Sequence, residues 1–274
     1  MRPPRGRGRA ARAGCDNRQT APLEFHLISD SDIRAELHAC DATEPTPALV
    51  RNLVLMSVAK GLSQHYGTKA NTKCLQSSLA IQHLLARHGI ESHVWIGELC
   101  LPQRVQPDGF VAWGGYWGDD HHVWTYTAKR SEIVDLTVKY LHQRGSLSGQ
   151  ASPAIPAIWC PIDRLPGRIL YIPQDVVQGV DPSFEDDVRA FVSLCVSIET
   201  SLRSRMRRSQ VRAEPVITDC DDLNALLKSR HHWSGVYAFF ELTKQPFPPD
   251  VQRRMADAER RAMRRSSGMS GTEG

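Results

Sequence analysis

Three residues of the chain have the types and the order that a thiol-based active site requires. They are Cys74, His122 and Asp135. A histidine can take the proton of a thiol, the resulting thiolate can attack an acyl carbon, and a carboxylate can hold the imidazole in the required tautomer and orientation. The sequence therefore predicts a Cys-His-Asp catalytic triad, provided that the elements around these residues bring them together.

Cys74 stands at the start of a predicted helix. Residues 75–88 are mostly strong helix formers, and Gly89 is typical of a left-handed helix stop. Asn71 or Thr72 is predicted as the N-cap. In the first helical turn, unpaired N–H groups and the positive end of the helix dipole lower the pKa of a thiol. The alternative is an ordinary buried thiol, because free cysteine is among the most buried residue types.

The backbone N–H of Cys74 is predicted to bind the oxyanion that forms on the attacked carbonyl, because a helix start leaves this donor uncommitted. A second donor stays open at this stage. The candidates are Gln64, Tyr66, Asn71 and Trp124.

His122 and Asp135 are predicted to face each other across a β-hairpin. The segments 121–127 and 132–138 are rich in β-branched and aromatic residues and flank a four-residue loop. Antiparallel pairing then places Tyr126 opposite Ile133 and Trp124 opposite Asp135. Because side chains alternate between faces, His122, Trp124 and Asp135 share one face and His122 and Asp135 become diagonal neighbours. His121 points to the other face and is the second choice for the base.

The region from Thr68 to Val138 resembles the transglutaminase-like superfamily of papain-fold cysteine enzymes. The resemblance lies in Lys73-Cys74 with the helix that follows, in Gly89-Ile90 with the strand 91–97, in His122-Val123-Trp124, and in 133–137. It implies that Cys74 is the nucleophile, His122 the base and Asp135 the third member. The insertion from Cys100 to Asp120 and the C-terminal region depart from the pattern.

The resemblance implies thioester chemistry on an amide or ester. Hydrolysis of an amide bond in a peptide or protein substrate is preferred, because water is always present and no amine site can be read from the sequence. One alternative is acyl transfer to an amine, as in transglutaminases or arylamine acetyltransferases. Another is a peptide-binding module of the same fold without turnover. No cofactor is expected.

The segments around the triad predict the walls of a substrate cleft. The aromatic, glycine-bearing stretch 110–120 is interpreted as a wall or lid, or as a strand with a bulge. Trp113, Tyr116 and Trp124 are the predicted substrate-binding residues. No metal site is expected, since the consecutive residues 119–122 cannot all point at one ion. Residues 145–161, which contain Ser, Gly and Pro, are predicted to form a surface loop.

The predicted fold class is α+β, with a papain-like or transglutaminase-like core in which the nucleophile helix packs on an antiparallel β-sheet and extra helices follow. Residues 1–22 are predicted to be a disordered Arg/Gly/Pro-rich arm, 23–178 the catalytic core, 179–265 a helical C-terminal extension and 266–274 a disordered tail. An amphipathic helix from Ala48 to about Tyr66 is expected beside the Cys74 helix.

Composition excludes several other classes. The 274 residues are 41% hydrophobic and 23% charged, which is ordinary globular composition. No apolar run reaches the length that a membrane span needs, and no signal peptide is recognised, so we expect a cytoplasmic protein. Its seven cysteines have irregular spacing and are predicted to be reduced. The net charge of +4 resides largely in the N-terminal arm, where stacking aromatics are missing, so nucleic-acid binding is not expected.

Overall fold

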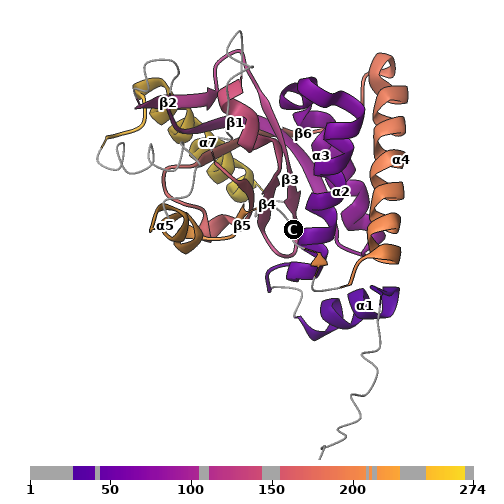
Figure 1. The fold of residues 1–274 in the computed structure, drawn as a ribbon. Coiled ribbons are helices and arrows are strands. Elements are labelled where there is room, and N and C mark those ends of the chain that lie inside the picture. Colours follow the sequence, from indigo (N-terminus) through magenta and orange to yellow (C-terminus); the bar gives the residue numbers. More distant parts are fainter. Residues whose placement is uncertain are drawn as a thin grey trace, which may run out of the picture.

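The computed structural model describes residues 27–40, 44–104, 111–143, 155–207, 210–211, 215–228 and 245–268. The predicted arm 1–22 and the end of the predicted tail, 269–274, lie outside these ranges. The structure is a mixed α+β fold in which helices surround one curled, mainly antiparallel sheet (Figure 1).

The helices are α1 (Asp30–Ala39), α2 (Ala48–Tyr66), α3 (Cys74–Arg87), α4 (Pro182–Arg205), α5 (Cys220–Lys228) and α7 (Pro249–Gly268). Short 3₁₀ segments are η1 (Gly67–Thr72), η2 (Thr137–Gln143) and η4 (Ile162–Arg164). The strands are β1 (Ser92–Arg104), β2 (Val111–Tyr116), β3 (His122–Thr127), β4 (Glu132–Asp135), β5 (Ala157–Pro161), β6 (Leu170–Val176) and β7 (Val216–Ile217).

Strand β1 is the centre of the sheet. One of its edges pairs with β6, and the other pairs first with β3, over 92–97, and then with β2, over 99–104. β2 and β3 are thus two halves of one interrupted strand, and the five residues 117–121 leave the sheet between them. Beyond β3 the sheet continues through β4 and β5 to β7, and only the β5–β7 pair is parallel.

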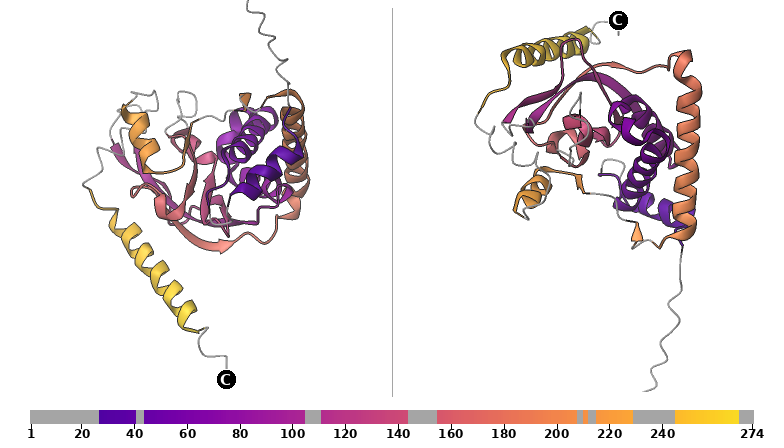
Figure 2. Two further views of the ribbon diagram at one scale, coloured as in Figure 1. Left: turned by 90° about the horizontal axis from the view of Figure 1, so that it is seen from below. Right: turned by 45° about the horizontal axis from the view of Figure 1, so that its top comes forward.

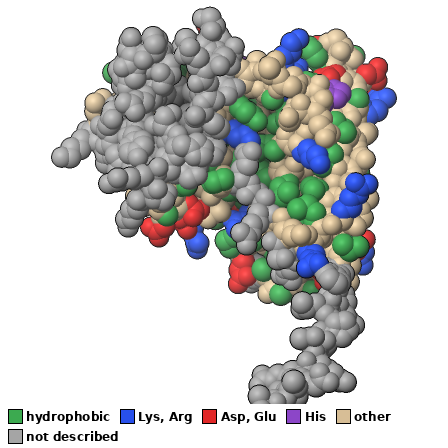
Figure 3. Space-filling view, viewed as in Figure 1, with side chains coloured by type: hydrophobic (Ala, Val, Ile, Leu, Met, Phe, Trp, Pro, Cys, Tyr) green, Lys and Arg blue, Asp and Glu red, His purple; other side chains and the backbone are tan. Residues whose placement is uncertain are grey.

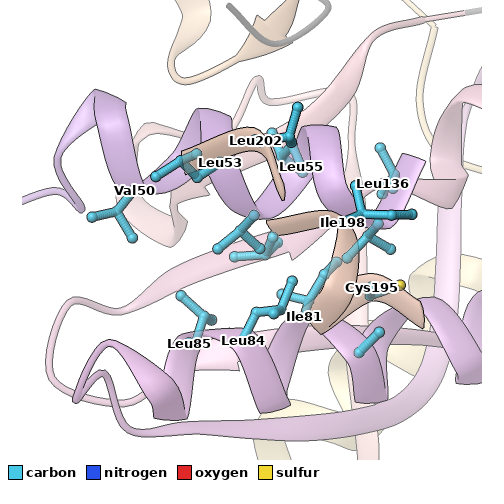
Figure 4. Close-up of a cluster of buried hydrophobic side chains, with 14 of the residues drawn as sticks. Val50, Leu53, Leu55, Ile81, Leu84, Leu85, Leu136, Cys195, Ile198 and Leu202 are labelled. Atoms are coloured by element: carbon cyan, nitrogen blue, oxygen red, sulfur yellow. The ribbon is translucent and has the colours of Figure 1, made fainter. Parts of the chain in front are cut away.

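The two faces of the sheet are covered differently. Helices α2, α3 and α4 lie together on one side, whereas α7 lies on the far side of the molecule and contacts β6 (Figure 2). The core between the three helices and the sheet is apolar, with side chains of α2, α3 and α4 interleaved (Figure 4). Within the predicted C-terminal extension 179–265, α4 supplies Phe191 and Cys195 to this core and β7 extends the sheet.

The prediction for residues 145–161 was wrong at its C-terminal end. The segment 145–161 was expected to be a surface loop, but its end is the strand β5, in which every residue is buried. Ile158 and Cys160 enter the core on one face of the sheet, and Trp159 enters the core of α2–α4 on the other. A strand that is covered on both faces lacks the polar alternation by which a strand is recognised.

Among the described residues, no helix is both long enough and apolar enough to cross a membrane. In the space-filling view, Lys and Arg side chains lie scattered on the face that is drawn, with apolar patches between them (Figure 3). The described part of this face therefore presents no continuous cationic surface to a phosphate backbone.

Candidate functional site

Helix α3 places Cys74 at its first position, as the sequence predicted. The helix ends at Arg87, and Gly89 has the positive φ of 74° expected of a helix stop. The predicted N-cap was wrong: Lys73 is the cap residue, Thr72 belongs to η1, and no side chain caps the helix. The first intrahelical bond runs from Ser77 N to Lys73 O at 2.9 Å. The earlier N–H groups of the helix, that of Cys74 included, therefore have no acceptor within the helix.

Small polar residues attach α3 to strand β3. The Ser78 hydroxyl donates to the Val123 carbonyl at 3.1 Å, and the Thr125 hydroxyl donates to the Ser78 carbonyl at 3.0 Å. Both side chains are buried. These reciprocal bonds hold α3 at one position along β3. They thereby fix where Cys74 lies relative to His122, the first residue of β3.

The hairpin has the predicted register. Tyr126 pairs with Ile133 and Thr125 with Val134. His122 Nε2 lies 2.6 Å from Asp135 Oδ2, and both side chains are 1% exposed. The predicted diagonal contact between imidazole and carboxylate is therefore formed, while His121 is exposed on the surface.

The thiol of Cys74 completes the group. It interacts with the His122 imidazole, and Cys74 is partly exposed whereas the other two residues are buried. His122 Nδ1 has no formed hydrogen bond with any described residue, so this ring nitrogen is the one left for the thiol. Cys74 is thus the member of the group nearest to solvent, while the imidazole and the carboxylate are shielded from water. In the absence of substrate, the hydrogen bond between a nucleophile and its base is often long, and it shortens when the substrate binds.

Asp135 accepts five hydrogen bonds. Its Oδ1 receives those of Thr137 N (3.0 Å), Thr137 Oγ1 (3.1 Å) and Val138 N (3.0 Å). Its Oδ2 receives His122 Nε2 and the Tyr171 hydroxyl, at 2.6 and 2.8 Å. Burial alone would raise the pKa of Asp135, but the interactions with His122 and Tyr171 lower it. The carboxylate is therefore held ionised in one orientation.

The charges of the pair His122 and Cys74 follow from this carboxylate. Burial alone would lower the pKa of His122, but the Asp135 charge outweighs it and raises that pKa to about 10. Burial would likewise raise the pKa of the Cys74 thiol, but the imidazole next to it lowers that pKa. Both shifts favour a thiolate paired with an imidazolium over two neutral groups.

Two aromatic rings flank the imidazole. Tyr116 stacks on His122 with centroids 5.0 Å apart, and Trp124 does so at 6.3 Å. The three rings follow one another along β1, because Tyr116, His122 and Trp124 pair with residues 99, 97 and 95 of that strand. Tyr116 is partly exposed, but Trp124 is only 2% exposed. Trp124 therefore packs against the imidazole from within the core, and its role in substrate binding stays a prediction.

The remaining predicted residues lie elsewhere. Trp113 packs against Phe247 with centroids 4.6 Å apart, away from the triad end of β2. Of the candidates for a second oxyanion donor, Tyr66 is committed by its hydroxyl to Asp187 at 2.9 Å. Within the described ranges, no three His, Cys, Asp or Glu side chains gather in a way that could hold a metal ion.

Two parts of the site were missed by the sequence analysis. The loop that follows Asp135 donates two backbone N–H groups to it, and an Asp followed two residues later by Thr is a signal for such a local turn. Tyr171, on β6, reaches the carboxylate from the far edge of β1, and no local pattern marks it.

Gly97, the partner of His122 on β1, is required by the close packing behind the site. A Cβ atom there would lie 2.2 Å from the Ile172 carbonyl oxygen and 2.9 Å from the Trp124 ring. We expect Gly97→Ala to lower the free energy of unfolding by about 1–3 kcal/mol, measured by urea denaturation. Gly167→Ala is the matched control, since no atom lies within 4 Å of its Cβ position. Equal stability of both variants would contradict the packing argument.

Comparisons of the chain with protein-family models, with curated proteins and with solved structures found no match.

Proposed function

We propose that the chain is a cysteine hydrolase that cleaves an amide bond in a peptide or protein through a thioester at Cys74. We also propose that its fold is a papain-like core of the transglutaminase-like type. The observation that carries the proposal is the buried 2.6 Å contact between His122 and Asp135, next to the thiol of Cys74, a partly exposed residue at a helix start. Three groups from three elements converge there in the arrangement that thiol activation needs.

The acylation step uses the charges already present. The Cys74 thiolate attacks the amide carbon, a carbon–sulfur bond forms, and the carbonyl electrons move onto oxygen. The Cys74 N–H stabilises this oxyanion. The His122 imidazolium then gives its proton to the amide nitrogen, the carbon–nitrogen bond breaks, and the amine leaves.

Deacylation reverses these roles. The neutral His122 takes a proton from water as the water oxygen attacks the thioester carbon. The carbon–sulfur bond breaks, the acid product leaves, and the thiolate and imidazolium are restored. Asp135 keeps the Nε2–H of the ring fixed throughout, so that Nδ1 always faces the sulfur.

Iodoacetamide alkylation tests the activated thiol without knowledge of the substrate. We expect Cys74 to react at a rate that is nearly constant from pH 6 to 8, because it is already a thiolate. Cys40 is also partly exposed and Cys220 is exposed. Both serve as internal comparisons for the alkylation rate of Cys74.

Peptide mapping after timed alkylation gives the three rates in one sample. In His122→Ala the alkylation rate of Cys74 should become steeply pH-dependent, because the imidazole that lowers the pKa of the thiol is gone. If Cys74 of the unaltered chain already shows that steep dependence, the thiolate–imidazolium pair is absent and the proposed function fails.

A further inference from the structure

Tyr171 shares an acceptor atom with the candidate base. Its hydroxyl donates to Asp135 Oδ2 at 2.8 Å, and His122 Nε2 lies 2.6 Å from the same oxygen. Tyr171 is 8% exposed, and both of its partners are more deeply buried. The other carboxylate oxygen, Oδ1, has separate donors in the loop after β4. These donors already hold the carboxylate in one orientation without Tyr171. The Tyr171 hydroxyl is therefore expected to act on the charge of Oδ2 and not on the orientation of Asp135.

The ring of Tyr171 is fixed independently of its hydroxyl. It packs edge-on against Trp124 with centroids 5.0 Å apart and an interplanar angle of 61°. Its strand β6 pairs with β1, where residue 171 is opposite Leu99. A phenylalanine could keep this position of the ring, so the hydroxyl can be removed with the loss of a single buried atom.

We propose that Tyr171 is a positioning residue that sets the basicity of His122 by withdrawing charge from Asp135 Oδ2. The inference rests on the proposed function, because it assigns Tyr171 a role in the reaction of the same site. The pKa of Tyr171 is raised well above its usual value by burial and by the Asp135 charge, so the hydroxyl stays a donor. It cannot become a second base.

The direction of the effect follows from the shared oxygen. A hydrogen bond to a carboxylate stabilises its charged form and reduces the pull of that oxygen on other protons. With the hydroxyl removed, Oδ2 attracts the Nε2–H of His122 more strongly, and the imidazolium becomes a weaker acid. The thiolate form of Cys74 is then preserved, but transfer of a proton to a leaving amine becomes harder.

Tyr171→Phe therefore separates two activities that a loss of structure would reduce together. Alkylation of Cys74, which needs only the thiolate, should be unchanged. Acylation by an ester with a poor leaving group should fall by about 10-fold, because that step needs the proton of His122. Acylation by 4-nitrophenyl acetate should hardly change, since nitrophenolate leaves without a proton.

The decisive experiment is a nuclear magnetic resonance titration of the chain with labelled histidine, together with acylation by 4-nitrophenyl and phenyl acetate. In the unaltered chain His122 should titrate near pH 10. In Tyr171→Phe its midpoint should rise by about one pH unit, and the ratio of phenyl to 4-nitrophenyl acetate rates should fall. Tyr126→Phe is the matched control, because Tyr126 is half-buried on β3 and its hydroxyl bonds to no described residue.

The results distinguish the inference from the proposed function. If His122 titrates at an ordinary pH in the unaltered chain, the proposed function itself fails. If His122 titrates high and Tyr171→Phe matches Tyr126→Phe in midpoint and in rate ratio, only the role of Tyr171 is refuted. A Tyr171→Phe chain that loses both acylation rates and alkylation equally shows a structural role, which also refutes the inference.

Discussion

Replacing Cys74 with serine is expected to abolish formation of an acyl-enzyme, with a fall of at least about 10³-fold in rate. The substitution replaces one sulfur by the smaller oxygen and keeps the helix start and the backbone N–H that is proposed to bind the oxyanion. The hydroxyl, however, has a far higher pKa than a thiol, so His122 cannot hold it as an anion in the resting site. Mass spectrometry of the intact chain after incubation with 4-nitrophenyl acetate measures the acetyl adduct directly.

Cys220→Ser is the matched control for this experiment, since Cys220 is an exposed thiol far along the chain. We expect the control to acquire one acetyl group at the rate of the unaltered chain, on the peptide that contains residue 74. An adduct that persists undiminished in Cys74→Ser would show that another residue is the nucleophile, whatever the geometry at α3.

The hairpin could be predicted in detail because its register depends on local features alone. Alternation fixes which side chains share a face, and a short loop fixes which residues pair, so Tyr126 opposite Ile133 followed directly. Ser131, at the end of the loop, has a φ of 51°, the left-handed conformation by which the chain turns back. The contact of His122 with Asp135 is a consequence of that register.

Helix bounds were predictable where residue preferences change sharply. The helix expected from Ala48 to about Tyr66 has those bounds as α2. The cap of α3 was predicted at the wrong residue, because η1 runs directly into the helix and Lys73 caps it without a side-chain bond. A chemically favourable cap such as Asn71 or Thr72 is a preference and not a requirement, and here the 3₁₀ segment uses both residues.

Contacts between distant segments left no local signal. Strand β5 is buried on both faces, so its residues lack alternation. Tyr171 is placed by the pairing of β6 with β1, and that pairing depends on the whole sheet. The break between β2 and β3 likewise could not be located from the sequence. For residues 110–120 a strand with a bulge was one of two predictions, and only the pairing of both strands with β1 shows that Tyr116 and His122 are neighbours.

Replacing Asp135 with asparagine is expected to lower the rate of acylation by about 10³–10⁴-fold. The amide keeps the size of the side chain but cannot stabilise an imidazolium. Burial then dominates, so the pKa of His122 falls from about 10 to below its usual value. At pH 7 the site would hold a neutral imidazole and a neutral thiol in place of the ion pair. Alkylation of Cys74 should therefore become steeply pH-dependent, as in His122→Ala.

The same substitution predicts a change in stability whose sign is fixed by linkage. In the unaltered chain the pKa of His122 is raised on folding, so its ion pair stabilises the fold fully below pH 6.5 and loses this contribution as the pH rises through about 10. Urea unfolding should thus show a larger deficit for Asp135→Asn at pH 6 than at pH 10.5. Asp163→Asn, at an exposed position, should show no such difference. An equal deficit at both pH values would mean that Asp135 acts only through its neutral hydrogen bonds, and the charged triad would have to be abandoned.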